Sequence, residues 1–369
     1  MILGDPAAAA PYHAARRARV MREIASRPFD ALLVTSLVNT RYLSGFSGSS
    51  AVALLTAGGA WFLTDFRYLE QAAREAPGMA LERVNDLAEG LGGLLARLEV
   101  RTLGFEAEHV SVAKLAKLRQ GCPNVEFVPT EKIVETQRLI KDEAEIGTLR
   151  ALVAMLETAM PAARELIRPG AVERDVAVEL EYRLRALGGD GPAFDFIVAS
   201  GARAALPHGV ASSKAIEPGE VVTLDWGVKG WGYYTDTTRT FTIGAVEPRM
   251  QEVLRVVNEA NLAALDAVRP GAELRAIDAA ARDLIKAAGY GDQFGHGTGH
   301  GVGMVIHEEP RVSYISTGVA EPGMVFTIEP GIYLPGIGGA RVEDMALVTG
   351  NGLEILTRGL SKDPLWLAR

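Results

Sequence analysis

The sequence contains a single cysteine, Cys122, among its 369 residues. An intrachain disulfide therefore cannot form, and a cysteine-ligated zinc ribbon cannot be built. This scarcity suits a reducing compartment, where disulfides are rare. A signal-peptide pattern is also missing, because Arg16, Arg17 and Arg19 follow the early alanine run instead of preceding it. These features predict a cytoplasmic protein.

An excess of basic charge is absent as well. The chain has 38 basic and 46 acidic residues, a formal charge of −8. Proteins that bind nucleic acids or membrane surfaces favour basic patches, so we expect neither partner. The most apolar early stretch, residues 51–63, is too short and too rich in glycine to span a bilayer. What remains is the composition of a globular protein with a sizeable core.

The first part of the chain alternates short apolar runs with helical periodicity, which is typical of an α/β domain. Five apolar runs predict strands, with a hairpin at Gly58-Gly59: residues 31–34, 51–55, 60–63, 102–105 and 125–128. A long amphipathic helix follows, with apolar residues at three- and four-residue steps from Ile146 to Met160. We therefore predict an α/β domain at residues 1–138 and a second domain at residues 139–369.

The second domain contains an internal repeat. The tetrapeptide RPGA occurs at residues 168–171 and again 101 residues later, at residues 269–272. The segment EPGEVVTLD, residues 217–225, recurs 104 residues later as EPGMVFTIE, residues 321–329. Each half combines helices with strands. The repeat predicts an α+β domain whose two halves pack about a pseudo-two-fold axis.

The repeat places carboxylates at equivalent positions. Asp225 aligns with Glu329, and each precedes a turn and a second strand with another carboxylate, Asp236 or Glu343. The pseudo-two-fold axis would bring all four together. Buried carboxylates repel one another unless positive charge compensates them, so the pattern predicts divalent cations. Oxygen ligands suit Mn²⁺ or Mg²⁺, and an added imidazole suits Co²⁺ or Zn²⁺. Separate surface salt bridges are the alternative for any one of these residues.

Histidines in the second domain strengthen the metal hypothesis. His208, His296, His300 and His307 lie beside glycines or within apolar segments. The run HGTGHGVG, residues 296–303, has glycine at every second position, which disfavours a helix. An extended, glycine-lined segment lets backbone and ligand approach closely. We therefore expect this segment to contribute to a functional site.

At these residues the sequence resembles the pita-bread metallopeptidases, in particular the aminopeptidase P and prolidase branch. The matching segments are LDWG (224–227), YTDTTRT (234–240), HGTGHGVG (296–303), TIEPGIY (327–333) and RVED (341–344). The first domain resembles the creatinase-type N-terminal domain through NTRYLSGF (39–46) and DFRY (65–68). The resemblance covers nearly the whole chain.

The resemblance implies a dinuclear centre with two divalent ions, Mn²⁺ first, with Co²⁺ or Zn²⁺ as alternatives. It implies five metal ligands: Asp225, Asp236, His300, Glu329 and Glu343. It also implies catalytic or pocket roles for a further group of side chains: His208, His296, His307, Tyr333 and Arg341. Water activated between two such ions attacks the peptide carbonyl, and we expect Glu329 to act as the general base.

The implied reaction is hydrolysis of the bond before a proline. We expect a prolidase, which cleaves Xaa-Pro dipeptides; an aminopeptidase P, which acts on longer peptides, is the alternative. An inactive binding module or a metal-free creatinase-type hydrolase should lack ligands that are present here, and the full N-terminal domain disfavours a methionine aminopeptidase.

Two further expectations concern the first domain. A dipeptide ends in a carboxylate directly after its proline, and a planar guanidinium can bind that group in a bidentate way. We predict Arg41 in this role, with Arg67 as the second candidate. The resemblance also implies a homodimer that forms through the N-terminal domain.

Overall fold

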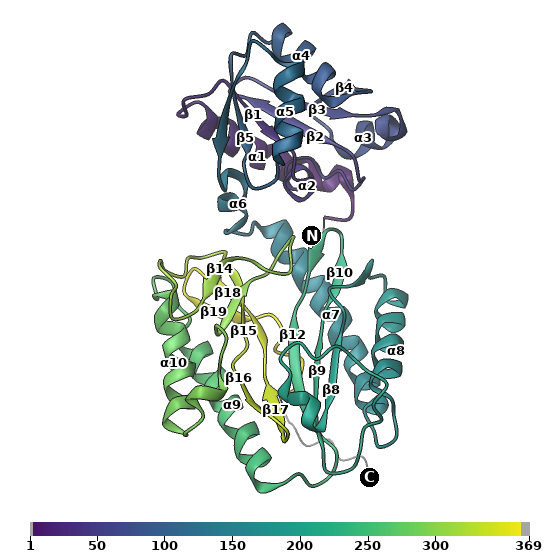
Figure 1. Ribbon diagram of the computed structural model, residues 1–369, viewed down its shortest axis with the longest axis vertical. Helices are drawn as coiled ribbons and strands as arrows, with labels where there is room; N and C mark the ends of the chain where they lie inside the picture. The colour runs from purple at the N-terminus through teal and green to yellow at the C-terminus, as the bar shows by residue number, and fades with distance from the viewer. Residues whose placement is uncertain (1–2, 363–369) are drawn as a thin grey trace. The chain divides into compact units, whose positions relative to one another are not determined.

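The computed structural model describes residues 3–362, and the chain divides into two compact units, Met1–Arg138 and Leu139–Arg369 (Figure 1). The first unit is an α/β domain, and the second combines helices with several small sheets. None of the helices in the described range combines the length and apolar character needed to cross a membrane.

The first unit is built on a six-stranded mixed sheet with the order β4-β3-β2-β1-β5-β6. Its strands are β1 (Ala31–Val34), β2 (Val52–Thr56), β3 (Ala60–Thr64), β4 (Ala80–Arg83), β5 (Thr102–Glu106) and β6 (Glu126–Thr130). β2 pairs with β3 in antiparallel fashion, which confirms the predicted hairpin. β1 is antiparallel to β2 and parallel to β5.

Helices cover both faces of this sheet. They are α1 (Pro6–Ile24), α2 (Leu37–Ser44), α3 (Leu69–Glu75), α4 (Leu87–Arg97), α5 (Val112–Gly121) and α6 (Ile133–Arg138), with a short 3₁₀ turn η1 (Phe66–Tyr68). Leu94 and Leu118 of α4 and α5 pack with Leu33 and Leu54 on one face. Phe62 belongs to a second cluster with Phe46 on the other face, since successive strand residues alternate sides.

The second unit opens with α7 (Glu143–Leu166), the long helix that the apolar periodicity predicts. The Asp142 side chain accepts hydrogen bonds from the backbone N–H groups of Ala144 and Glu145, and the Asp142 backbone N–H donates to the Glu145 side chain. This reciprocal capping fixes where the helix starts. The apolar face, which includes Leu149 and Leu156, is buried.

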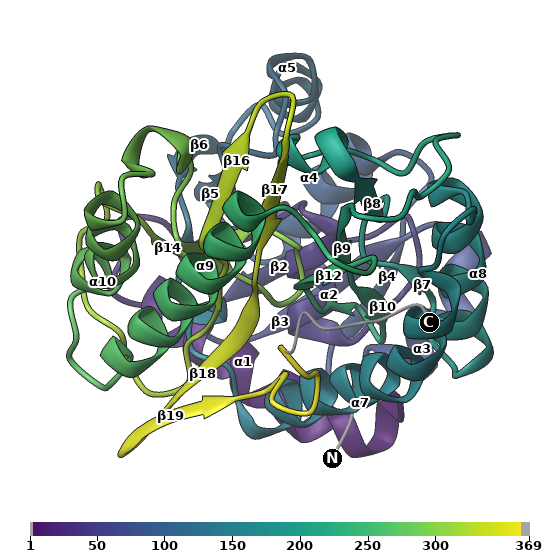
Figure 2. The same cartoon turned by 90° about the horizontal axis from the view of Figure 1, so that it is seen from below.

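Two helices flank each half of the duplicated unit. α7 and α8 (Glu173–Ala186) lie on one side of the strands, and α9 (Pro248–Ala267) and α10 (Leu274–Ala287) lie on the other (Figures 1 and 2). The RPG turns that precede α8 and α10 match closely, because Gly170 and Gly271 both adopt φ +80°. Gly219 and Gly323 of the repeated EPG turns are also left-handed, at +85° and +92°. Glycine adopts this conformation without the steric cost other residues meet.

The strands of the first half are β7 (Gly191–Pro192), β8 (Ile197–Ser200), β9 (Val221–Trp226), β10 (Val228–Gly230), β11 (Tyr233–Tyr234) and β12 (Thr237–Thr242), with η2 (Gly201–Ala205) between β8 and β9. Those of the second half are β13 (Gly299–Gly301), β14 (Glu308–Val312), β15 (Val325–Ile328), β16 (Gly331–Leu334), β17 (Gly338–Arg341), β18 (Asp344–Thr349) and β19 (Gly352–Ile355), preceded by η3 (Gly291–Gln293). The sheet orders are β12-β9-β8 and β14-β13-β15-β18-β19.

Both halves interrupt a strand pair with a short antiparallel hairpin, called a ribbon below; in the first half, β7 also pairs with β10. β9 pairs with β12, and the β10–β11 ribbon lies between them in the chain; β15 pairs with β18, and the β16–β17 ribbon lies between them. The second carboxylate of each half, Asp236 or Glu343, stands directly before the returning strand instead of inside it. This differs from the expected turn and carboxylate-bearing strand, because the ribbon replaces a simple turn.

Candidate active site

The duplicated strands bring the predicted carboxylates and one histidine together in the second unit. Asp236, His300 and Glu343 each offer a ligand atom, and these atoms lie within 4.8 Å of one another. His300 Nε2 is 3.6 Å from Asp236 Oδ2 and 3.2 Å from Glu329 Oε1. Asp225 lies on β9, and its charge acts on both Asp236 and Glu343. All five residues therefore surround one location.

Two threonines hold the carboxylates in place. Thr238 faces Asp225 across the β9–β12 pair, and its hydroxyl donates a 2.7 Å hydrogen bond to Glu343 Oε2. Thr327 donates to Glu329 Oε1 at 3.1 Å and accepts a hydrogen bond from the His300 backbone N–H. Neither threonine is among the predicted ligands or pocket residues. Thr327 could have been found because it lies two residues before Glu329, on the same strand face.

Burial and mutual repulsion raise the pKa values of three of the carboxyl groups. Burial, followed by the charges of Glu343 and Asp225, raises the pKa of Asp236 well above its usual value. Burial and the charges of Glu329 and Asp225 likewise raise the pKa of Glu343. Burial also raises the pKa of Asp225, although the Arg341 guanidinium acts in the opposite direction. The metal-free site thus carries more negative charge than its own cations balance.

Glu329 behaves differently from the other carboxylates. Burial raises its pKa, but the hydrogen bond from His300 and the His300 charge outweigh that effect and lower the pKa to about 2. Glu329 thus differs from Asp225, Asp236 and Glu343, whose pKa values are raised. Its carboxylate is ionised at neutral pH and can accept a proton.

Arg341 connects the carboxylate cluster to the aromatic side of the site. Its Nη2 donates to Asp225 Oδ2 at 2.5 Å, and its Nη1 donates to the Tyr333 hydroxyl at 3.0 Å. The same hydroxyl lies 2.9 Å from His296 Nε2. Arg341 Nε donates to Thr238 Oγ1. Because these groups are buried, the network fixes the Asp225 carboxylate in a single orientation.

The donor set fits divalent metal ions. Asp225 Oδ1 is buried, and no donor among residues 3–362 forms a hydrogen bond to it. A buried oxygen without a partner is costly unless a cation or another donor satisfies it. Four carboxylates and one imidazole at a single location also match the ligand preferences of first-row divalent metals. A bound cation would at the same time remove the repulsion among Asp225, Asp236 and Glu343.

His307 and His208 are exposed side chains at the edge of this cluster. The His307 ring lies edge-on to the His300 ring, with centroids 4.3 Å apart. Burial and the charges of His300 and His208 lower the pKa of His307, so its imidazole is neutral at neutral pH. Arg341 Nη1 donates to the Pro207 carbonyl, which ties the His208 loop to the carboxylate cluster.

The glycine-lined segment is extended, as predicted, and its glycines are required sterically. A Cβ on Gly299 would collide with the Thr327 carbonyl, and one on Gly301 would collide with the Glu309 carbonyl. Gly299 and Gly301 flank His300 on β13. Close backbone packing on both sides of His300 therefore places its imidazole against Glu329.

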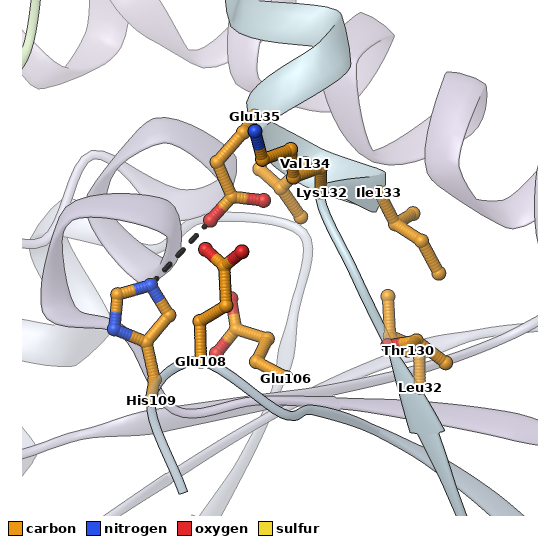
Figure 3. Close-up of a pocket in the computed structure, with 9 residues that line it drawn as sticks. All are labelled: Leu32, Glu106, Glu108, His109, Thr130, Lys132, Ile133, Val134 and Glu135. Atoms are coloured by element: carbon orange, nitrogen blue, oxygen red, sulfur yellow. Dashed lines mark ion pairs between the residues drawn. The ribbon is translucent and has the colours of Figure 1, made fainter. Parts of the chain in front are cut away.

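The first unit contains a separate small pocket with acidic walls (Figure 3). Glu106 accepts hydrogen bonds from the Ser36 backbone and the Asn39 side chain, and Asn39 also donates to Glu135. His109 Nε2 lies 3.5 Å from Glu135. These contacts fasten the start of α2 to the sheet. Among the described residues, the one group with metal-ligand spacing is that of Asp236, His300 and Glu343.

The two arginines predicted to bind a substrate carboxylate belong to the first unit. Arg41 lies in α2, and Arg67 lies in η1. The Arg67 guanidinium makes two hydrogen bonds to Asp65, at 2.8 and 2.9 Å, so a substrate carboxylate would compete with that side chain. The role of either arginine in substrate binding stays a prediction.

The family model for metallopeptidase family M24 matches residues 147–350. The chain belongs to metallopeptidase family M24. The model for the creatinase/prolidase N-terminal domain matches residues 16–140. Membership in M24 accounts for the carboxylates and histidine of the second unit, since divalent metals serve the family's chemistry.

Relatives of this M24 chain are similar across both units. An Xaa-Pro dipeptidase from Pyrococcus horikoshii is 37% identical over 331 residues, which cover 89% of this chain and 93% of the relative. The solved structure of an Xaa-Pro dipeptidase from Bacillus anthracis matches with a TM-score of 0.91 at 39% identity, covering 94% of this chain and 98% of that one. An X-Pro aminopeptidase from Thermotoga maritima matches with a TM-score of 0.88 at 35% identity, covering 94% and 99%.

We expect Asp236→Asn to stabilise the metal-free protein, because it removes one of the crowded buried charges with almost no change in shape. The free energy of unfolding at pH 8 should rise by roughly 1–3 kcal/mol. The measurement is chemical denaturation of metal-free wild type and variant. The gain should shrink as pH falls through the raised Asp236 pKa, since the wild-type carboxyl then takes up a proton and repels less.

Asp195→Asn is the matched control, because Asp195 is exposed and its replacement should change stability by less than about 0.5 kcal/mol. A destabilised Asp236→Asn protein would contradict the view that repulsion dominates this site.

Proposed function

We propose that this M24 enzyme hydrolyses the bond before proline, principally in Xaa-Pro dipeptides. The observation that carries the proposal is the convergence of His300 with four carboxylates, three of them buried, from the two halves of the repeat. The dipeptidase from Pyrococcus horikoshii and that from Bacillus anthracis support the substrate class, because the similarity extends over both units.

We propose Asp225, Asp236, His300, Glu329 and Glu343 as the ligands of two divalent ions, with Mn²⁺ favoured over Co²⁺ and Zn²⁺ because most donors are carboxylate oxygens. Bound divalent ions lower the pKa of water toward neutrality and polarise a carbonyl. The neighbouring side chains then orient the substrate and move the proton.

Glu329 is the proposed general base. Thr327 donates a hydrogen bond to its Oε1, which orients the carboxylate, and the group is ionised at neutral pH. It accepts the proton of the attacking water and delivers it to the departing proline nitrogen. That nitrogen carries no hydrogen in an Xaa-Pro peptide and must gain one for the bond to break.

Two histidines at the exposed edge of the site are proposed to donate hydrogen bonds to the substrate. The neutral His307 imidazole keeps one N–H that can donate to the oxyanion that forms from the scissile carbonyl. His208, which lies close enough for its charge to affect His307, is the second donor candidate. Tyr333 and His296 are held on the other side by Arg341, and we assign them to orienting the peptide.

Aminopeptidase P activity is the second candidate, favoured by the likeness to the Thermotoga maritima X-Pro aminopeptidase. The deciding experiment compares hydrolysis of an Xaa-Pro dipeptide with that of the Xaa-Pro-Xaa tripeptide at equal concentration and saturating Mn²⁺. We expect the dipeptide to have the higher kcat/KM. A clear preference for the tripeptide would assign the chain to aminopeptidase P, and cleavage of neither would refute the proposal.

We further propose that the protein works in the cytoplasm as a homodimer that associates through its first unit. The single cysteine, which is buried at the end of α5, supports a reducing compartment. Sedimentation at micromolar concentration measures the mass directly, and a monomeric mass would refute the dimer.

A further inference from the structure

A fully buried asparagine interrupts the apolar face of α9. Asn261 is 0% exposed, and Val257 and Leu265, one helical turn before and after it, belong to the hydrophobic core. At the 101-residue offset of the repeat, the first half has Met160 in the corresponding position. Packing of the helix therefore does not require a polar group here. A buried amide is costly unless it is hydrogen-bonded, which points to a specific purpose for this one.

The contacts of Asn261 lie directly behind two of the carboxylates. Its Nδ2 donates to the Ile328 carbonyl at 2.9 Å and to the Val342 carbonyl at 3.2 Å. These peptide groups immediately precede Glu329 and Glu343. Its Oδ1 accepts a 2.7 Å hydrogen bond from Lys362 Nζ. Both donor hydrogens and the acceptor oxygen are thus used.

The two carbonyls belong to segments that the chain connects through the β16–β17 ribbon. Ile328 ends β15, and Val342 lies between β17 and β18. Two residues from the first half of the repeat also hold Glu343. Thr238 donates a hydrogen bond to its side chain, and Arg239 donates one to its carbonyl oxygen. The backbone already joins the Glu343 segment to the Glu329 segment, since β15 pairs with β18 and the Val342 N–H donates to the Pro330 carbonyl. Asn261 adds a side-chain link between the two segments and joins both to α9.

This link acts at the points where two of the ligands begin. The bonded carbonyls belong to the peptide groups that lead directly into Glu329 and Glu343. A shift of either segment relative to α9 would move its carboxylate away from the other. An amide bonded to both carbonyls restrains these shifts, and with them the starting points of the two side chains.

We propose that Asn261 is a positioning residue that holds Glu329 and Glu343 at metal-binding separation before any metal arrives. The inference rests on the metal-dependent function proposed above. Groups behind the ligands commonly contribute ten- to hundredfold to metal affinity. Asn261 should contribute in this range because it acts on two ligands at once.

The test titrates metal-free protein with Mn²⁺ in a calorimeter and compares wild type with Asn261→Leu. Leucine keeps the approximate volume but donates no hydrogen bond to either carbonyl. We expect the Mn²⁺ dissociation constant to rise by roughly 10- to 100-fold. Val257→Ala is the matched control, since it removes core volume from the same helix face one turn away. Its thermal stability should fall while its Mn²⁺ affinity stays within about threefold of wild type.

Wild-type affinity in folded Asn261→Leu would overturn the inference, as would an equal loss of affinity in Val257→Ala. If Asn261→Leu does not fold, Asn261→Asp decides, because it keeps the shape but turns an oxygen toward both carbonyls. It should bind Mn²⁺ at least about tenfold more weakly, and unchanged affinity would overturn the inference. A wild-type protein that binds no Mn²⁺ would refute the metallopeptidase proposal itself, and the role of Asn261 with it.

Discussion

Removal of divalent metal is expected to abolish hydrolysis of Xaa-Pro peptides and to lower the thermal stability of the protein. In the metal-free site, the buried Asp225 Oδ1 has no hydrogen-bond donor among the described residues, and the Asp236 and Glu343 carboxyl groups are crowded together. The site therefore carries uncompensated negative charge. A metal that binds the folded chain at a hundred times its dissociation constant stabilises it by about 2.7 kcal/mol. For a domain of this size that corresponds to a rise in Tm of roughly 5–10 °C.

The measurement is activity and Tm after chelation and dialysis, and again after Mn²⁺, Co²⁺ or Zn²⁺ is returned. Chelator premixed with excess metal is the control for direct effects of the chelator. We expect Mn²⁺ to restore both activity and stability. Undiminished hydrolysis by protein shown to be free of metal would exclude the mechanism proposed for this site.

Glu329→Gln is expected to lower kcat by roughly 10²- to 10⁴-fold, the usual contribution of a general base. The amide oxygen can still accept the hydrogen bond from Thr327, so the fold and the local geometry should survive. The amide cannot take a proton from water, however. The loss should therefore persist at saturating substrate and saturating Mn²⁺.

Glu321→Gln is the matched control, because the same change is made at an exposed position in the EPG turn that precedes β15. It should retain full activity. Metal content and circular dichroism of both variants separate a chemical defect from lost metal or lost structure. Near wild-type kcat in metal-loaded Glu329→Gln would remove Glu329 from the role of base and leave it as a ligand alone.

The sequence alone determined those parts of the structure that depend on local chain chemistry. The duplicated RPG and EPG turns are visible in the sequence because a left-handed backbone favours glycine, and the structure has positive φ at Gly170, Gly271, Gly219 and Gly323. The start of α7 is equally local, since Asp142 and Glu145 form a capping box within four residues. The pairing of Asp225 with Glu329 as equivalents follows from the repeat itself.

Tertiary structure decided the properties that depend on distances between remote residues. The rise in the pKa values of Asp236 and Glu343 and the fall at Glu329 follow from which charges burial places beside each carboxyl, and sequence spacing does not encode those distances. Asn261 looks like an ordinary polar helix residue until the fold sets it beneath two carbonyls that lie 67 and 81 residues further along the chain. Its bonds join segments that are neighbours because β15 pairs with β18 and α9 packs behind them, which only the folded second half brings about.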